Sequence, residues 1–244
     1  AKLKGNLVIP SSVAFMGDSA FQSAYADTDK SNMGMLSFEN GSKLTSIPAY
    51  AFDKCLAFKG SIVIPEGVTS IGQYAFEKCS GMDGTLSLPS GLETIGNYAF
   101  SECSKLTGGI TLPDTLTQLG TYTFNKCSNI NGELVLSKNL KNIPQAAFSN
   151  CSSMIGSVDI PEGVQKINAN AFQGCSSLNG TLTIPETVDT IGAYAFDQCS
   201  LLTGTLTIPG KVTNVSNYAF DACSGFDALK LSDSITTIGN YAFA

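Results

Sequence analysis

Eight cysteines are the residues whose chemistry and spacing first suggest a function for this chain. They recur at a constant interval of 24 residues, at Cys55, Cys79, Cys103, Cys127, Cys151, Cys175, Cys199 and Cys223. Thiols in such an arrangement could be disulfide partners, metal ligands, nucleophiles or structural core residues. Each of the first three roles requires further groups, which the rest of the sequence must supply.

The usual partners of catalytic and metal-binding cysteines are missing. The 244 residues contain no histidine, which excludes Cys-His and Ser-His-Asp catalysis and removes the commonest protein ligand of zinc. One cysteine every 24 residues also differs from the closely spaced cysteine pairs of structural zinc sites. We therefore expect neither an enzyme nor a cofactor or metal site built on these thiols.

The cysteines belong to a longer repeat that predicts a solenoid. A phenylalanine precedes each cysteine by three residues, and Phe21 and Phe243 extend that series to about ten coils. Residues 181–184 alternate polar and apolar, as in a half-buried strand, and Pro185 ends that strand. Apolar residues then follow at 191, 194, 195 and 199, the spacing of a short helical or 3₁₀ segment. We expect a single domain over residues 1–244, with a parallel β-sheet on one face and short helical segments on the other.

Stacked coils would place the cysteines in a ladder of parallel side chains. Neighbouring Cβ atoms would then lie about 5 Å apart, farther than the ~3.5–4.5 Å of a disulfide. We expect reduced, buried thiols that donate to nearby backbone carbonyl groups. Disulfides between neighbouring coils are the alternative.

Residues 25–43 interrupt the period with two polar segments, YADTDKSN (25–32) and ENGSK (39–43). Both are rich in turn-forming residues and predict loop insertions. The run from Asp27 to Asn32 begins like a calcium loop, but Asn32 and Phe38 stand where that loop needs glycine and glutamate. A polar loop is the favoured interpretation, and calcium binding is the alternative. Neither end of the chain carries a polar capping sequence, so we expect a fragment of a longer protein or ends covered by other domains.

Two repeated columns are candidate binding surfaces. The first is a tyrosine column for which we expect partial burial between coils, with ligand recognition as the alternative: Tyr50, Tyr74, Tyr98, Tyr122, Tyr194, Tyr218 and Tyr241. The second is the outward, hydroxyl-rich face of the predicted strands, where a binding face and simple strand propensity remain equally open. Its candidate residues are Thr85, Ser87, Thr111, Glu133, Val135, Ser157, Asp159, Thr181, Thr183, Thr205 and Thr207.

Charge and hydropathy limit the partners. The formal net charge of −6 argues against nucleic acid, which requires a basic surface. Polar, glycine or proline residues interrupt every apolar run well before the ~18–20 residues of a membrane span. No membrane insertion is expected within this chain.

The repeated pattern L-x-I-P-x-x-V-x-x-I-G-x-x-A-F-x-x-C-x-x-L resembles the BspA-like leucine-rich repeats of bacterial surface proteins, related to the Treponema pallidum type. One unit matches at Ile64-Pro65, Ile71-Gly72, Ala75-Phe76 and Cys79. Departures include Thr123 for alanine, Ser137 for proline and Pro144 for glycine.

This resemblance implies a right-handed leucine-rich-repeat solenoid, export to the cell surface, and adhesion to host proteins, host cells or other bacteria. The expected function is therefore an extracellular, non-enzymatic module that binds a host or bacterial surface protein. Carbohydrate binding on the Thr/Ser-rich face and a passive spacer are the alternatives.

Overall fold

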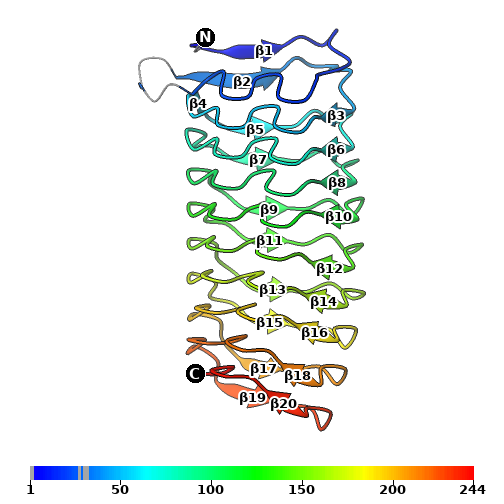
Figure 1. Cartoon of the computed structure of the whole chain (residues 1–244), viewed down its shortest axis with the longest axis vertical. Coiled ribbons are helices and arrows are strands. Elements are labelled where there is room, and N and C mark those ends of the chain that lie inside the picture. Colours follow the sequence, from blue (N-terminus) through cyan, green and yellow to red (C-terminus); the bar gives the residue numbers. More distant parts are fainter. Residues whose placement is uncertain (1–2, 27–28, 30–32) are drawn as a thin grey trace.

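The computed structural model describes residues 3–26, 29 and 33–244. The chain winds into coils that stack in one column, with the N-terminal and C-terminal residues at opposite ends (Figure 1). Each regular coil contributes two short strands and a series of turns. The expected solenoid is therefore confirmed, although its turns are built differently from the prediction.

The first strand row runs along the middle of the column in the view of Figure 1. Polar and apolar residues alternate in it, so that one side chain enters the core while the next points outward. In Val158–Asp159, for example, the valine is buried and the aspartate is exposed. The row consists of β1 (Leu7–Ile9), β2 (Gly34–Phe38), β4 (Phe58–Lys59), β5 (Ile62–Val63), β7 (Leu86–Ser87), β9 (Ile110–Thr111), β11 (Leu134–Val135), β13 (Val158–Asp159), β15 (Leu182–Thr183), β17 (Thr205–Thr207) and β19 (Ala228–Lys230).

A second strand row, which was not expected from the sequence, runs beside the first. Its strands are only two residues long, too short to show an alternating pattern. They mark nine turns of the solenoid in the described residues, against the roughly ten coils expected. The row consists of β3 (Ser46–Ile47), β6 (Ser70–Ile71), β8 (Thr94–Ile95), β10 (Gln118–Leu119), β12 (Asn142–Ile143), β14 (Lys166–Ile167), β16 (Thr190–Ile191), β18 (Asn214–Val215) and β20 (Thr237–Ile238).

Strands pair in parallel with the equivalent residues of the next coil, as in Ile71 with Ile95. The first row divides into the sheets β1-β2-β4, β5-β7, β9-β11, β13-β15 and β17-β19. The second row divides into β10-β8-β6-β3 and β12-β14-β16-β18-β20. The expected parallel arrangement is thus confirmed, but it consists of several short sheets.

Two prolines mark where the sheets of the second row begin. In four coils the strand is followed by a glycine whose N–H donates to the preceding coil, as Gly72 does to the Ile47 carbonyl oxygen over 2.8 Å. Pro48 follows β3 and Pro144 follows β12, and each of these strands is the first of its sheet. Since proline has no N–H to donate, the bond to the preceding coil cannot form at either position.

The predicted helical or 3₁₀ segments are wrong, because the described residues contain no helix and the YAF stretches are successive turns. Tyr74 and Lys78 both adopt a φ of 57°, which interrupts right-handed helical winding. Alternate N–H groups therefore bond in different directions. The N–H of Glu77 donates within its coil to Tyr74 O over 3.2 Å, whereas that of Phe76 donates to Ala99 O in the next coil over 2.7 Å. The backbone N–H groups of these turns therefore bond partly within their own coil and partly to the next coil.

One hydrophobic core runs through the column. Its centre is a continuous stack of phenylalanine rings from Phe21 to Phe243, with successive centroids 5.1–5.7 Å apart. The rings from Phe52 to Phe220 are at most 1% exposed. Burial of one large ring per coil explains why the phenylalanine recurs with the period.

The described residues of the 25–43 region pack against the solenoid. Tyr25 is buried and packs against Phe58 with ring centroids 4.4 Å apart. Residues 34–38 form β2, which pairs with β1 and β4. The N–H of Glu39 donates to Ile9 O over 3.0 Å. The predicted calcium-like run 27–32 lies outside the described residues, apart from Asp29.

Candidate functional site

The cysteine ladder lies inside the column, beside the phenylalanine stack. Each thiol donates to the carbonyl oxygen of a phenylalanine in the preceding coil, as Cys79 does to Phe52, with sulfur–oxygen distances of 3.0–3.2 Å along the ladder. Seven of the cysteines are buried and Cys223 is half-buried. The expectation of buried thiols that cap backbone carbonyl groups is confirmed, with Cys223 the least enclosed.

Burial makes these thiols poor nucleophiles. It raises the pKa of Cys103 and Cys175 from 9.0 to about 12. It also raises the pKa of Cys127, where the neighbouring cysteines act in the same direction. The thiolate, which is the reactive and metal-binding form, is therefore disfavoured at neutral pH. The described residues also hold no group of three or more side chains suited to binding a metal ion.

The tyrosine column forms two stacks rather than one. Rings from Tyr50 to Tyr122 lie face to face with centroids 4.8 Å apart, and a second stack runs from Tyr194 to Tyr241. Ala146 and Asn170 occupy the two positions between the stacks. Partial burial is confirmed for these tyrosines except Tyr241, which is 62% exposed at the last coil. Because each ring covers its neighbour, the stacks present edges and hydroxyl groups to solvent rather than ring faces.

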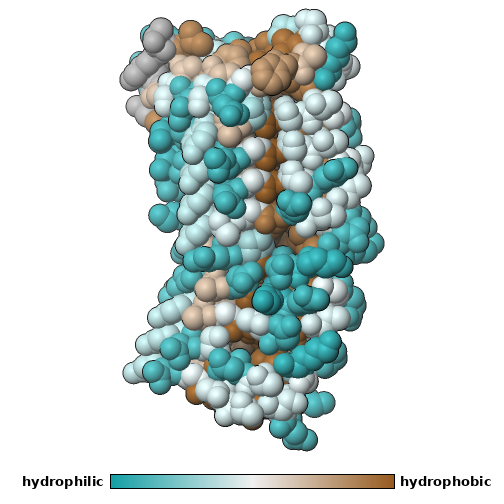
Figure 2. Space-filling view, turned by 45° about the vertical axis from the view of Figure 1, so that its right-hand side comes forward, coloured by the Kyte–Doolittle hydropathy of each residue, from teal (hydrophilic) through white to brown (hydrophobic). Residues whose placement is uncertain are grey.

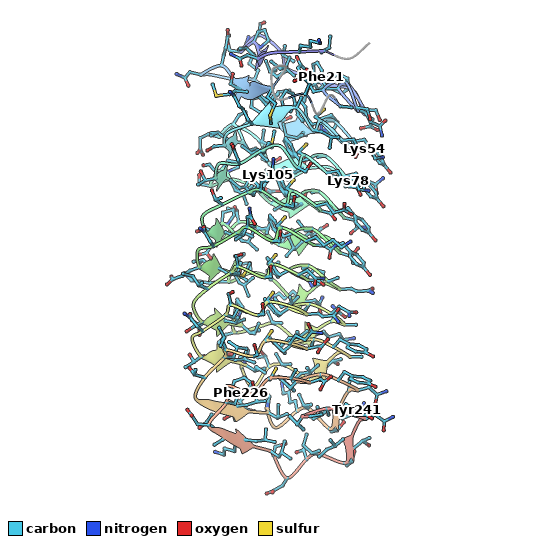
Figure 3. The ribbon with its side chains drawn as sticks, turned by 90° about the vertical axis from the view of Figure 1, so that its left-hand side faces the viewer. Phe21, Lys54, Lys78, Lys105, Phe226 and Tyr241 are labelled. Carbon is cyan, nitrogen blue, oxygen red and sulfur yellow. The ribbon has the colours of Figure 1, made fainter. Side chains whose placement is uncertain are left out.

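Charged residues lie on the same side of the solenoid as the tyrosine stacks. Figure 3 shows Lys54 and Lys78 one above the other on this side, with Tyr241 near its C-terminal end. Lys78 Nζ lies 3.2 Å from Glu77 Oε1 and 4.0 Å from Glu102 Oε1. The hydrogen bond to Glu77 raises the pKa of Lys78. The neighbouring depression of about 580 Å³ is lined by serines and by residues of both charges, so it selects no obvious ligand class.

The outward side chains of the first strand row are hereafter called the sheet face. Ten of the eleven candidate residues on it are exposed, and Ser157 is half-buried. Some of the hydroxyl groups bond one another, since Ser157 Oγ lies 3.4 Å from Thr181 Oγ1. The exposed positions are Thr85, Ser87, Thr111, Glu133, Val135, Asp159, Thr181, Thr183, Thr205 and Thr207. The structure brings these residues into one extended surface.

Aliphatic side chains are distributed among these hydroxyl groups. Val63 and Val135 are 59% and 50% exposed on strands β5 and β11. Val8 and Met35, at the N-terminal end of the same row, are each 50% exposed. None of the large exposed apolar side chains on the described strands of this face is aromatic. The sheet face therefore combines small polar groups with isolated aliphatic contacts.

Sequence reasoning missed a second period in the turn before each first-row strand. Every second coil carries a glycine with positive φ, and an Asx side chain of the next coil accepts its N–H. Asn131 Oδ1 accepts the N–H of Gly108 over 2.8 Å, and Asn179 Oδ1 accepts that of Gly156 over 3.0 Å. The signal is visible in the sequence as Asp or Asn before glycine in alternate coils, at 83, 131 and 179. It pairs the coils two by two, in agreement with the two-stranded sheets of this row.

Sequence comparison identifies the class of protein. The BspA-type leucine-rich-repeat region matches residues 45–179 and 153–244, with six copies. This chain therefore belongs to the BspA-type leucine-rich-repeat family. No curated protein sequence matches it.

Among solved structures, a leucine-rich repeat protein from Bacteroides ovatus is 26% identical with a TM-score of 0.69, over 98% of this chain and 64% of that one. A leucine-rich repeat protein from Eubacterium ventriosum is 20% identical with a TM-score of 0.51, over 98% of this chain and 57% of that one. The Treponema pallidum leucine-rich repeat protein is 26% identical with a TM-score of 0.49, over 73% of this chain and 72% of that one. The chain thus spans less than two thirds of the Bacteroides protein.

The part of the chain that the structure describes contains no helix with the length and apolar character of a membrane span.

Proposed function

We propose that this chain is a non-enzymatic binding module of a bacterial cell-surface protein, and that its sheet face recognises a protein partner. The observation that carries the proposal is the sheet face itself, with ten exposed candidate residues spread from β7 to β17. Solenoid proteins commonly bind through such extended surfaces. Membership of the BspA-type family supports the cell-surface location.

The composition of the sheet face favours a protein over a carbohydrate. Exposed aliphatic groups such as Val63 and Val135 gain from burial against apolar side chains of a partner. Sugar rings are commonly recognised by stacking on aromatic side chains, which the exposed apolar positions of this face do not provide. A carbohydrate ligand on the same face and a passive spacer are the two competing functions.

A binding assay on immobilised protein distinguishes the three functions. The chain is tested against a panel of extracellular-matrix proteins, whole host cells and a glycan array, and we expect saturable binding to a protein. Thr183→Arg places a long charged side chain on β15 in the middle of the sheet face. Thr190→Arg makes the same change on β16 of the second strand row and serves as the matched control.

Thr183→Arg is expected to weaken binding at least about tenfold, because close packing at the centre of an interface carries most of its energy. Thr190→Arg should bind like the parent chain. Binding to glycans alone would favour the carbohydrate function, and an absence of binding across the panel would favour the spacer.

A further inference from the structure

Three asparagine–glycine pairs occur in the sequence, and such pairs undergo a covalent change without any enzyme. The backbone nitrogen of the glycine attacks the side-chain amide carbon of the asparagine, because glycine has no Cβ to hinder the approach. The three pairs are Asn40-Gly41, Asn131-Gly132 and Asn179-Gly180. Each is a candidate deamidation site, and the folded structure decides which of them can react.

Solvent exposure does not distinguish the three pairs, because all three asparagines are exposed. What differs is the hydrogen bonding of the two groups that react with each other. These groups are the side-chain amide of the asparagine and the N–H of the glycine that follows. A hydrogen bond to either group must break before the nitrogen can reach the amide carbon.

Asn131 is held by one glycine of the preceding coil. Its Oδ1 accepts the N–H of Gly108 over 2.8 Å, and the N–H of Gly132 donates to the carbonyl oxygen of the same Gly108 over 2.9 Å. The backbone of Gly132 is also tightly packed, since an added Cβ would collide with the nitrogen of Gly109. Both hydrogen bonds would have to break for the reaction, so the fold opposes it at this pair.

Asn179 is held in the same way, two coils further along the column. Its Oδ1 accepts the N–H of Gly156 over 3.0 Å, and the N–H of Gly180 donates to the carbonyl oxygen of Gly156 over 3.0 Å. An added Cβ at Gly180 would collide with the hydroxyl group of Ser157. This pair is therefore protected by the same two hydrogen bonds and by similar packing.

Asn40 lacks these constraints. In the part of the chain that the structure describes, no hydrogen bond involves its side chain or the N–H of Gly41. A Cβ added at Gly41 would meet no atom within 4 Å, so this backbone is surrounded by open space. The turn joins β2 to β3 near the N-terminal end of the column, which is at the top of Figure 2 and carries hydrophilic and hydrophobic residues side by side.

We propose that Asn40 is a site of spontaneous deamidation in the folded protein, and that the other two pairs are protected. The nitrogen of Gly41 loses its proton and bonds to Cγ of Asn40, while the bond from Cγ to Nδ2 breaks and ammonia leaves. The cyclic imide that results takes up one water molecule at either of its carbonyl groups, which yields aspartate or isoaspartate. Water is the only co-reactant, and no electrons are transferred.

The modification changes the charge at one end of the sheet face. Asn40 lines a hollow of about 470 Å³ together with Glu39, Glu66 and the sheet-face residues Val63 and Ser87. The two glutamates are the only charged residues among those that line it. Deamidation adds a third carboxylate, so this end of the face becomes more negative as the protein ages. The reaction requires no binding partner, so the proposal can fail or succeed independently of the proposed function.

Peptide mass mapping of the parent chain, aged at mildly alkaline pH and physiological temperature, tests the proposal. The folded chain is compared with the chain in guanidinium chloride. In the folded chain, Asn40 should deamidate at least about tenfold faster than Asn131 and Asn179. In guanidinium chloride the three asparagines should react at similar rates, because the hydrogen bonds to Gly108 and Gly156 are lost.

Enzymatic methylation of isoaspartate in the Asn40→Gln variant provides a second readout. Asn40 is exposed, so this substitution does not put folding at risk. Glutamine cyclises much more slowly because a larger ring must form, and the folded variant should accumulate at least about tenfold less isoaspartate than the parent chain. The proposal is overturned if Asn40 stays intact in the folded chain over the period in which it converts in guanidinium chloride. It is also overturned if Asn131 or Asn179 reacts as fast as Asn40 in the folded chain.

Discussion

The thiol of Cys103 donates a hydrogen bond to the carbonyl oxygen of Phe76, one coil earlier, over 3.1 Å. The same relationship recurs along the ladder and joins each coil to its predecessor through the interior. The cysteine is conspicuous in the sequence because it repeats. It repeats because each coil encloses a small buried side chain whose thiol donates to a phenylalanine carbonyl oxygen of the preceding coil. Its role is structural.

Native thiols should therefore react slowly with a water-soluble disulfide reagent. We expect the buried cysteines to stay unlabelled at neutral pH, because burial both blocks access and raises the thiol pKa, to about 12 for Cys103. Cys223, which is half-buried, should react first. All eight thiols should become reactive in denaturant. Rapid labelling of the whole set without denaturant would contradict the buried ladder.

The same thiols predict a loss of stability at alkaline pH. The folded-state pKa of Cys103 lies near 12, above the ordinary value of 9.0, so folding favours the protonated thiol. This stabilisation is complete below pH 9.0 and is lost as pH rises toward 12. The free energy of unfolding, measured in urea, should be level near neutral pH and then fall by up to about 1.4 kcal/mol per pH unit for each such thiol.

Cys103→Ala is the control for this pH dependence. It removes one titrating thiol and should make the alkaline decline shallower. It should also lower stability at neutral pH by about 0.5–1.5 kcal/mol through loss of the thiol hydrogen bond to Phe76 O, which still accepts the N–H of Cys79 over 3.2 Å. A stability that stays constant to about pH 11 would show that the thiols do not couple to folding.

Exchanging proline and glycine should have unequal consequences for stability at Gly72 and at Pro144 of the second strand row. Gly72→Pro removes the bond to Ile47 O and places a ring where an added Cβ would lie 2.5 Å from the nitrogen of Ala49. We expect a loss of about 3 kcal/mol or more in the free energy of unfolding. Pro144→Gly lies where the sheets are already separate and should change stability by less than about 1 kcal/mol. Equal destabilisation by both changes would refute the assigned break.

Completing the tyrosine column should stabilise the fold. Asn170 adopts a φ of 61°, close to the 60° of Tyr194, so a tyrosine fits the local backbone there. Asn170→Tyr should stack on Tyr194 and raise the free energy of unfolding by about 0.5–1.5 kcal/mol. The comparison is Asn170→Ala, which keeps the backbone position without a ring. A tyrosine variant no more stable than the alanine variant would argue against stacking as a source of stability.

The sequence predicted the repeat well and the turns poorly, for a physical reason. The spacing of Ile191, Tyr194, Ala195 and Cys199 suits a helix. Turns that alternate bonds within and between coils instead bury Ile191, Ala195 and Cys199 and leave Tyr194 half-buried. The positive φ of Tyr194, 60°, could not be predicted from the sequence pattern, because non-glycine residues seldom adopt a positive φ. Strong inter-coil bonds and ring stacking stabilise that unusual backbone.

The candidate surfaces were predictable to different degrees. The sheet face followed from strand alternation, because outward positions such as Thr183 are fixed once the strand and its core residue are known. The second strand row was not predictable, since its strands are only two residues long. The break between its two sheets falls at Pro144, which in the sequence is only a departure from the glycine consensus.

Binding by Thr183→Arg, compared with Thr190→Arg, tests the central claim most directly. Both variants replace a threonine by arginine on consecutive strands of the chain, β15 of the first row and β16 of the second, and they differ in the face that they alter. With a protein partner identified for the parent chain, we expect Thr183→Arg to lose at least about tenfold in affinity while Thr190→Arg binds normally. Equal affinity of both variants for that partner would contradict a binding function of the sheet face.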